Sequence, residues 1–441
     1  MHQLLTLGSQ LPTAAGPCTI ERFLGGGGQG EVYQVSVASQ PPSALKWYFP
    51  QQATADQRQA LQTLIRKGPP GPGFLWPLEL IEAPQTPGFG YLMPLREPRF
   101  HGIVDLMKRR IEPDFRALTL AGLHLSQAFL ALHAKGLCYR DISFGNVFLD
   151  PDSGAIAICD NDNVTIDGSD PGGILGTPRF IAPEVVRGEA RPGTQTDLFS
   201  LAVLLFYLFH IHHPLEGRQE AEIKCFDLPA MTRLYGTDPC FIFDPADDRN
   251  RPVPGLHDNA IAHWGIYPEF LREHFTRGFT SGLRDPQARI RESEWRLALA
   301  RLLDGIHYCG QCGAENFHDP AAGSAGTCWS CGQPLRLPWR LRLADALGGA
   351  PSRYPVLLNH DTRLYAHHLD PDRRYDFVTP LAEVNRHPSD PNRWGLKNLG
   401  PDKWVITGAD GQLRDVEPGR SAGLVSGLRI DFGPLRGVLE G

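Results

Sequence analysis

Two polar side chains five residues apart, Asp141 and Asn146, form a pair that could do chemistry. They lie within residues 139–146, a polar stretch between two apolar runs, which indicates a turn. A carboxylate held in such a turn can accept the proton of a hydroxyl group, and an amide oxygen can bind a metal ion. This spacing is typical of a loop that catalyses phosphoryl transfer.

Four further motifs occur in the order that such a site requires. They are Gly25-x-Gly27-x-x-Gly30-x-Val32, Ala44-Leu45-Lys46, Asp160 at the end of the apolar run 155–159, and Ala182-Pro183-Glu184. With these motifs, the chain from about residue 15 to about 305 resembles the eukaryotic-like (Hanks-type) Ser/Thr protein kinases, in a bacterial-type variant. The resemblance implies an α+β, bilobal protein kinase fold over residues 1–305, with a small lobe at about 15–95 and a large lobe at about 96–305.

The resemblance also implies that the domain binds ATP and Mg²⁺. In this interpretation Asp141 is the catalytic base, Asn146 and Asp160 bind Mg²⁺, and Lys46 contacts the α and β phosphates. Glycines allow backbone N–H groups to approach phosphates closely. The position of Met93 resembles that of the gatekeeper residue at the back of the adenine pocket. The expected nucleotide-binding residues are Gly25, Gly27, Gly30, Val32, Ala44, Lys46, Met93, Pro94 and Arg96.

The helix expected at residues 53–67 departs from the family because it contains no glutamate that could pair with Lys46. Its apolar face places Gln57 at the usual glutamate position, with Asp56 one residue away and pointing elsewhere. We therefore expect Lys46 to pair with Asp160 when nucleotide is absent. We also expect the substitution Gln57→Glu to be tolerated or mildly activating.

Two departures occur in the catalytic motifs themselves. Ser143 stands where Ser/Thr kinases usually have a lysine that touches the γ-phosphate, and Asn161-Asp162 replaces the Phe-Gly that usually follows Asp160. For Asp162 the sequence leaves two readings, a second polar contact near the metal or a solvated turn residue, and favours the turn residue. The resemblance also implies that Glu184 pairs with Arg289 and that Asp197 bonds the backbone of the catalytic loop.

Four cysteines occur as two pairs, Cys309-x-x-Cys312 and Cys328-x-x-Cys331. Two such pairs, each at a glycine turn, are typical of a structural Zn²⁺ site with four thiolate ligands, which leaves no open position for catalysis. The sequence therefore predicts a Cys₄ zinc ribbon at residues 306–340.

Short apolar runs separated by turns continue through residues 345–441, a pattern that predicts an all-β sandwich or barrel, of which we expect a small sandwich. The stretches 394–399 and 427–433 resemble the second half of forkhead-associated domains. The arginine and the Ser-x-x-His element with which that family binds phosphothreonine are not evident. We therefore expect a binding module that does not recognise phosphothreonine.

The composition is that of an ordinary globular protein, with 441 residues, 41 % hydrophobic and 21 % charged. The formal net charge of −6 gives no electrostatic reason to expect nucleic acid or an anionic membrane as a partner. No basic segment followed by a long apolar one occurs at the N-terminus, so we expect a cytoplasmic protein that does not bind membranes.

Two functions agree with these motifs. The first is an ATP- and Mg²⁺-dependent Ser/Thr protein kinase whose C-terminal modules place a protein substrate or partner. The alternative is a pseudokinase scaffold, favoured by the missing helix glutamate and by the altered catalytic motifs. The variant loop is also similar, by analogy alone, to bacterial kinases that accompany a von Willebrand A-type protein and a PP2C-type phosphatase.

Overall fold

The computed structural model describes residues 3–83, 86–169, 175–345 and 354–441. The chain divides into two units, one formed by residues 1–265 and 270–299 and the other by residues 266–269 and 300–441. The first unit contains the two lobes expected of a kinase. The second contains the cysteine pairs and the C-terminal strands.

The small lobe is a six-stranded antiparallel sheet in the order β1-β2-β3-β4-β6-β5. Its strands are β1 (Gln10–Thr13), β2 (Gly16–Gly26), β3 (Gly30–Val37), β4 (Ser43–Tyr48), β5 (Glu79–Glu82) and β6 (Phe89–Pro94). Leu5 and Leu11 are buried in the core of this sheet, so the lobe begins before the predicted residue 15.

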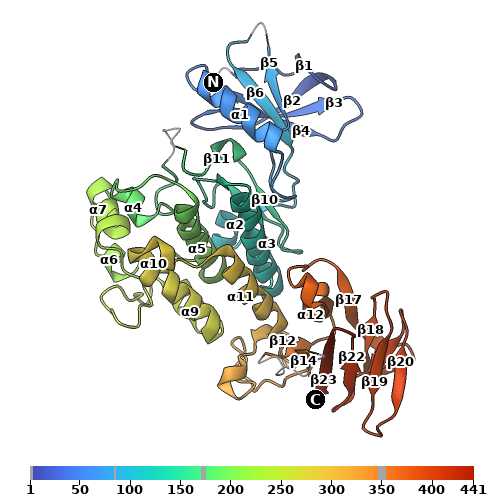
Figure 1. Ribbon diagram of the computed structural model, residues 1–441. Helices are drawn as coiled ribbons and strands as arrows, with labels where there is room; N and C mark the ends of the chain where they lie inside the picture. The colour runs from blue at the N-terminus through green and yellow to red at the C-terminus, as the bar shows by residue number, and fades with distance from the viewer. Residues whose placement is uncertain (1–2, 84–85, 170–174, 346–353) are drawn as a thin grey trace. The chain divides into compact units, whose positions relative to one another are not determined.

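Helix α1 (Ala55–Lys67) lies beside this sheet (Figure 1). It begins where the Thr54 side chain caps the backbone N–H of Gln57, and it ends at Gly68, whose φ of 67° favours glycine. Leu61 and Leu64 form its buried face. The predicted helix is therefore present, with Gln57 on it and no glutamate.

The large lobe is mainly helical, and its two longest helices are α3 (Phe115–Ala134) and α5 (Thr194–His210). Helix α3 is long and apolar enough to cross a membrane, but most of it is buried inside the lobe, as in the core helix of a globular domain. Around them lie α2 (Ile103–Met107), α4 (Pro183–Val186), α6 (Arg218–Ala221), α7 (Leu228–Thr232), α8 (Asp258–Trp264), α9 (Glu269–Gly278), α10 (Ser281–Arg284) and α11 (Glu292–Asp304).

Short strands hold the loops that carry the polar motifs. Strands β7 (His101–Gly102), β9 (Val147–Leu149) and β10 (Ile156–Ile158) form one small sheet, and β8 (Leu137–Cys138) pairs with β11 (Thr165–Ile166) in another. The loop with Asp141 and Asn146 joins β8 to β9. A single 3₁₀ turn, Asn161–Asn163, follows Asp160 after β10.

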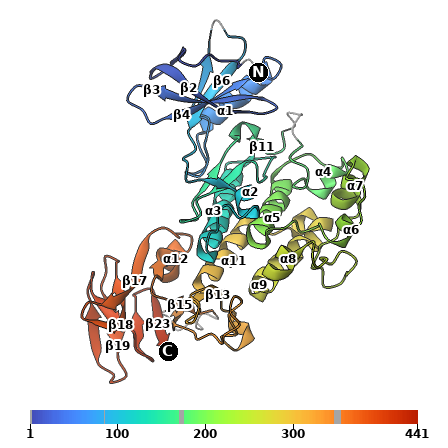
Figure 2. The same cartoon turned by 180° about the vertical axis from the view of Figure 1, so that it is seen from behind.

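The second unit contains a small hairpin and a sandwich of two sheets (Figure 2). The hairpin is β12 (Ile306–Tyr308) with β13 (Glu315–Phe317). One sheet of the sandwich has the order β15-β14-β23-β22-β19-β20 and the other β16-β17-β18-β21. Their bounds are β14 Trp339–Asp345, β15 Val356–Leu358, β16 Arg363–Tyr365, β17 Pro380–His387, β18 Asp390–Asn398, β19 Trp404–Thr407, β20 Leu413–Val416, β21 Ser421–Gly423, β22 Arg429–Asp431 and β23 Leu435–Glu440.

The sandwich has its own apolar core, which includes Leu341, Trp404, Ile430 and Leu439. Strand β14 pairs with the last strand, β23, so the sandwich begins at Trp339 and takes two residues from the predicted ribbon. It also contains one short helix, α12 (Ala366–Leu369). Residues 346–353, at the start of the predicted module, lie outside the described part of the chain.

Candidate active site

A cavity of about 460 Å³ lies under the glycine-rich turn between β2 and β3. Residues 24–30, Val32, Lys46, Asp141, Asp160 and Asn163 line it. This volume is within the usual range for a small-molecule site. The structure thus brings the glycine motif, Lys46 and two of the proposed catalytic acids to one cavity.

The three motif glycines have different reasons to be glycine. A Cβ at Gly30 would lie 2.2 Å from the backbone carbonyl oxygen of Trp47, whereas nothing lies within 4 Å of a Cβ built at Gly25 or Gly27. Gly30 is therefore required by the close packing of β3 on β4. No neighbouring atom requires glycine at 25 or 27, and both residues line the cavity, where the lack of a side chain lets a phosphate approach the turn.

Lys46 is buried on β4 and its ammonium group contacts three side chains. Nζ lies 2.8 Å from Oδ2 of Asp162, 2.8 Å from Oε1 of Gln29 and 3.5 Å from Oδ1 of Asp160. Across the sheet, Val32 and Tyr91 are the direct partners of Lys46 in β3 and β6. The prediction that Lys46 pairs with Asp160 is therefore incomplete, because its closest acid is Asp162.

The interpretation of Asp162 as a solvated turn residue is wrong. Its side chain is fully buried and also accepts hydrogen bonds from the hydroxyls of Tyr48 (2.6 Å) and Tyr91 (3.0 Å). Burial by itself raises the pKa of this carboxyl, but the Lys46 ammonium outweighs it and holds the pKa below its usual value. Gln57 joins the cluster only through its amide, which donates to the Tyr48 hydroxyl at 3.0 Å.

Sequence reasoning missed Tyr48, Tyr91 and Gln29. One signal was present, because Tyr48 follows Lys46 by two residues on a strand and so shares its face. Gln29 lies at the tip of the glycine-rich turn, and its amide also donates to Oδ1 of Asn163 at 3.4 Å. Nothing in the sequence alone indicated that the turn reaches Lys46.

The Asp141 carboxylate is held from two sides, by Asn146 of the catalytic loop and by Thr177 of a later segment. Its Oδ1 accepts a hydrogen bond from the Thr177 hydroxyl at 2.6 Å, and its Oδ2 accepts one from Nδ2 of Asn146 at 2.9 Å. The same amide nitrogen donates to the backbone carbonyl of Asp141, so the amide oxygen of Asn146 points away from this acid. Ser143 is buried, and its hydroxyl accepts from the backbone N–H of Gly145. It cannot replace a lysine that reaches a phosphate.

The backbone of this loop is held by Asp197 on α5. The carboxylate accepts from the N–H of Tyr139 at 2.6 Å and from the N–H of Arg140 at 3.0 Å, which confirms the anchoring role expected of this acid in the family. His133 lies between Asp197 and Glu292. Burial lowers the pKa of His133, but hydrogen bonds to the two carboxylates outweigh it and raise the pKa to about 9.

The predicted pair of Glu184 and Arg289 is confirmed. The guanidinium donates to both carboxylate oxygens, at 2.8 and 2.7 Å, and is almost completely buried. These two hydrogen bonds hold the end of the segment that carries Thr177. They therefore support the hydrogen bond from Thr177 to Asp141.

The residues expected around adenine lie on the strands and the connection at the lobe boundary. Ala44 and Met93 are buried and are register partners between β4 and β6. Pro94 ends β6. The side chain of Arg96 lies over the ring of Phe148, with 4.1 Å between the guanidinium carbon and the ring centroid. The role of Arg96 in nucleotide binding remains a prediction.

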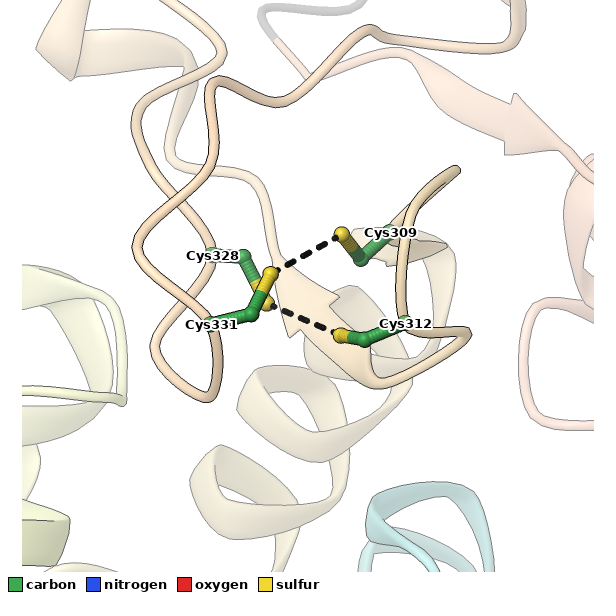
Figure 3. Close-up of side chains that lie close together, drawn as sticks. All are labelled: Cys309, Cys312, Cys328 and Cys331. Atoms are coloured by element: carbon green, nitrogen blue, oxygen red, sulfur yellow. Dashed lines mark hydrogen bonds between the residues drawn. The ribbon is translucent and has the colours of Figure 1, made fainter.

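The four cysteines converge from two turns in the second unit, and Figure 3 shows their sulfurs facing one another. The Sγ atoms of Cys309 and Cys331 are 3.7 Å apart and those of Cys312 and Cys328 are 3.6 Å apart. Four sulfurs at the usual Zn–S length of about 2.3 Å from a tetrahedral centre would be about 3.8 Å apart. The separations fit a metal site and are far too long for disulfides.

The two cysteine turns are built alike and are joined by Asn316. In each turn the glycine after the second cysteine, Gly313 or Gly332, donates its N–H to the carbonyl of the first cysteine. Burial raises the pKa of the Cys328 thiol, but backbone N–H groups of the turn and the Asn316 amide outweigh it and lower the pKa to about 6. A thiolate is the form that binds metal.

Comparisons with known proteins agree with the first unit. The family model of the protein kinase domain matches residues 102–252. Similar curated proteins include the probable serine/threonine-protein kinase CCRP1 of Zea mays, 30% identical over 119 residues (26% of this chain, 18% of the relative). The cell cycle serine/threonine-protein kinase CDC5/MSD2 of Saccharomyces cerevisiae is 30% identical over 140 residues (28% and 19%).

A bacterial relative is the serine/threonine-protein kinase PknK of Mycobacterium bovis, 34% identical over 121 residues (27% of this chain, 11% of the relative). The match spans less than a fifth of the length of each of these three relatives. The matched region contains the catalytic loop, Asp160 and the Ala-Pro-Glu segment described above. Residues 102–252 of this chain therefore match a protein kinase domain, and the proteins similar to this region are serine/threonine-protein kinases.

Proposed function

We propose that this protein transfers the γ-phosphoryl group of ATP to Ser or Thr hydroxyls of a protein substrate, in a reaction that depends on Mg²⁺. The observation that carries the proposal is that Lys46, Asp141 and Asp160 together line one cavity under the glycine-rich turn. These groups supply the positioning and the charge on which phosphoryl transfer depends.

Asp141 is suited to orient the substrate hydroxyl and to accept its proton. The hydrogen bonds from Thr177 and Asn146 fix the carboxylate and leave each oxygen a further lone pair for the incoming hydroxyl. Lys46 supplies the positive charge on the cavity wall, where it would bind phosphate oxygens. Ser143 offers no second charge of this kind, so we expect a slower reaction than in kinases that have the lysine.

The residues expected to hold Mg²⁺ fit that ion by their chemistry. Asn146 uses its amide nitrogen on Asp141 and keeps its amide oxygen available, and Asp160 offers a partly exposed carboxylate at the cavity. Both are oxygen ligands of the kind Mg²⁺ prefers. When bound, the ion would neutralise phosphate charge during transfer.

The test measures transfer of ³²P from γ-labelled ATP with Mg²⁺, to the protein itself and to a generic Ser/Thr substrate. Asp141→Asn should lower the rate at least 10²-fold, the usual contribution of a positioned base, with little change in ATP affinity. Asp160→Asn should weaken Mg²⁺-dependent ATP binding as well. The matched control is Asp152→Asn, an exposed acid on the β9–β10 turn, which should behave as the parent does.

A parent protein that binds Mg·ATP but transfers no phosphate would refute the kinase assignment and favour the scaffold. Turnover by Asp141→Asn at the parent rate would show that the base is another group. Loss of turnover in the Asp152→Asn control would show that the assay reports damage to the fold.

For the second unit we propose a structural Zn²⁺ bound by Cys309, Cys312, Cys328 and Cys331, and a β sandwich that places a substrate or partner. The sulfur separations support the zinc site. A von Willebrand A-type protein and a PP2C-type phosphatase stay predictions as partners. Binding of the purified protein to phosphothreonine peptides and to their unphosphorylated forms tests the sandwich, and we expect no preference for the phosphorylated form.

A further inference from the structure

The lysine that binds phosphates in a protein kinase is normally paired with a glutamate of the small-lobe helix, and both must be in place for transfer. In this chain α1 has Gln57 at that position. We propose that Asp162, on the turn after Asp160, is the positioning residue that holds Lys46 for the nucleotide in place of a helix glutamate. This inference rests on the proposed function and names a residue for the same site.

The Asp162 carboxylate is fully buried, and each of its two oxygens accepts two hydrogen bonds. Lys46 Nζ contacts both oxygens, at 2.8 and 3.0 Å, and one tyrosine hydroxyl donates to each oxygen, Tyr48 to Oδ2 and Tyr91 to Oδ1. An acid left in a buried place without such partners is strongly unfavourable. The site is therefore built around a charged carboxylate paired with Lys46.

The turn that carries Asp162 is itself held in place by hydrogen bonds. The Asn161 side chain donates to the backbone carbonyls of Leu75 and Ile158, both at 2.9 Å. Arg140 of the catalytic loop donates to the carbonyl of Asn163 at 2.8 Å. Residues on both sides of Asp162 are thus fixed by contacts that do not involve α1.

The position of Lys46 is consequently tied to the turn that carries Asp160. In a kinase with a helix glutamate, movement of the helix breaks the pair. Here Gln57 reaches the pair only through the Tyr48 hydroxyl, which lies between Gln57 and Asp162. Helix α1 therefore acts on the pair of Lys46 and Asp162 only indirectly, through Tyr48 and through its packing on the turn.

Asp162 also leaves part of the lysine free for the substrate. The ammonium has three donors, and one of them points to Oε1 of Gln29 on the glycine-rich turn, at the cavity. A phosphate oxygen can take the place of this amide oxygen while Asp162 keeps its contact. Asp162 thus positions Lys46 without occupying the face that the nucleotide needs.

The experiment compares the parent, Asp162→Asn, Gln57→Glu and the double variant Asp162→Asn/Gln57→Glu. The matched control is Asp56→Asn, an exposed acid next to Gln57 on the same helix. For each protein, kcat, KM for ATP, the Kd of Mg·ATP by calorimetry and the melting temperature are measured. Asp162→Asn should lower kcat/KM and weaken Mg·ATP binding by about 30-fold or more, because it neutralises one partner of a buried ion pair.

A glutamate at position 57 places a carboxylate where the helix of other kinases has one. The double variant should therefore recover at least about tenfold of the lost kcat/KM, a gain that a merely structural role of Asp162 does not predict. The Asp56→Asn control should match the parent in all four measurements.

Two results would overturn the proposal. One is an Asp162→Asn variant whose Kd and kcat/KM both stay within about threefold of the parent. The other is a loss that accompanies a fall in melting temperature and that Gln57→Glu does not relieve, which would make Asp162 a residue of the fold alone. The Kd of Mg·ATP needs no turnover, so Asp162 is still judged on binding if the parent transfers no phosphate and the proposed function fails.

Discussion

The ion pair between Arg289 and Glu184 tests how the large lobe holds the segment that carries Thr177 and ends at Glu184. The Arg289 guanidinium donates two hydrogen bonds to the carboxylate of Glu184, one to the carbonyl of Gln195 at 2.7 Å and one to the carbonyl of Gly282 at 3.1 Å. The perturbation is Arg289→Met, which keeps most of the side-chain volume. It leaves a nearly buried carboxylate and two backbone carbonyls without these donors.

Removing one partner of a buried ion pair costs about 3–5 kcal/mol. For a unit somewhat larger than 250 residues, 1 kcal/mol corresponds to a melting shift of about 2 °C, so Arg289→Met should lower the melting temperature of the first unit by about 6–10 °C. Arg289→Lys keeps the charge but loses the two-pronged geometry, and should cost about half as much. Turnover should fall together with stability, because the segment that Glu184 anchors carries Thr177, the partner of Asp141.

Scanning calorimetry is the assay, since it can separate the transition of the first unit from that of the second. Arg284→Met, at an exposed arginine of α10, is the control. The double variant Arg289→Met/Glu184→Leu removes both charges and should recover much of the loss, because replacing a whole buried pair by apolar groups is often neutral. An Arg289→Met shift within 2 °C of the Arg284→Met control would refute the reasoning.

Three further results are expected. Gly30→Ala should destabilise the small lobe by about 1–3 kcal/mol, because its Cβ would overlap the Trp47 carbonyl, while Gly25→Ala should weaken ATP binding without lowering the melting temperature. Elemental analysis should find one zinc per chain, and chelation should unfold the Cys₄ turns, since structural zinc contributes on the order of 10 kcal/mol to a small module; freshly purified protein without zinc would contradict this. Folding raises the pKa of His133 from 6.5 to about 9, so its stabilisation is complete below pH 6.5 and is lost as the pH rises through 9. Melting temperatures of the parent and of His133→Gln between pH 6 and 10 test this, and equal pH dependence in both would exclude His133 as the cause.

Much of the first unit could be predicted from the sequence because its motifs depend on local chemistry. The pair of Glu184 with Arg289 and the anchoring of the catalytic loop by Asp197 are both present in the structure. The four cysteines were equally predictable, because two turns with the same spacing can satisfy one tetrahedral centre. In these cases the residue types and spacing determine the contact.

The partner of Lys46 could not be predicted in this way, since it depends on where three distant segments meet. Asp162 follows Lys46 by more than a hundred residues, and a polar residue after a strand is in most cases a solvated turn. Only the fold brings the hydroxyls of Tyr48 and Tyr91 to the same point and makes burial of the acid favourable. The start of the sandwich at Trp339 was missed for a similar reason, because β14 is defined by its pairing with the last strand of the chain.

The sequence departures around Lys46 are related to one another. The carboxylate that is missing from α1 is matched by a carboxylate on the turn after Asp160. A kinase of the usual pattern has one carboxylate on the helix and one at the position of Asp160, and here the helix has lost its carboxylate while the turn has gained Asp162. The number of acids that face the lysine is therefore unchanged, and the replacement of Phe by Asn161 supplies the hydrogen bonds that hold the new acid in place. A scaffold would need this balance too, because a buried lysine requires a carboxylate partner, but it would have no need for the lysine itself at the cavity. The presence of a paired Lys46 at the cavity, together with Asp141 and Asp160, thus favours catalysis over the pseudokinase alternative.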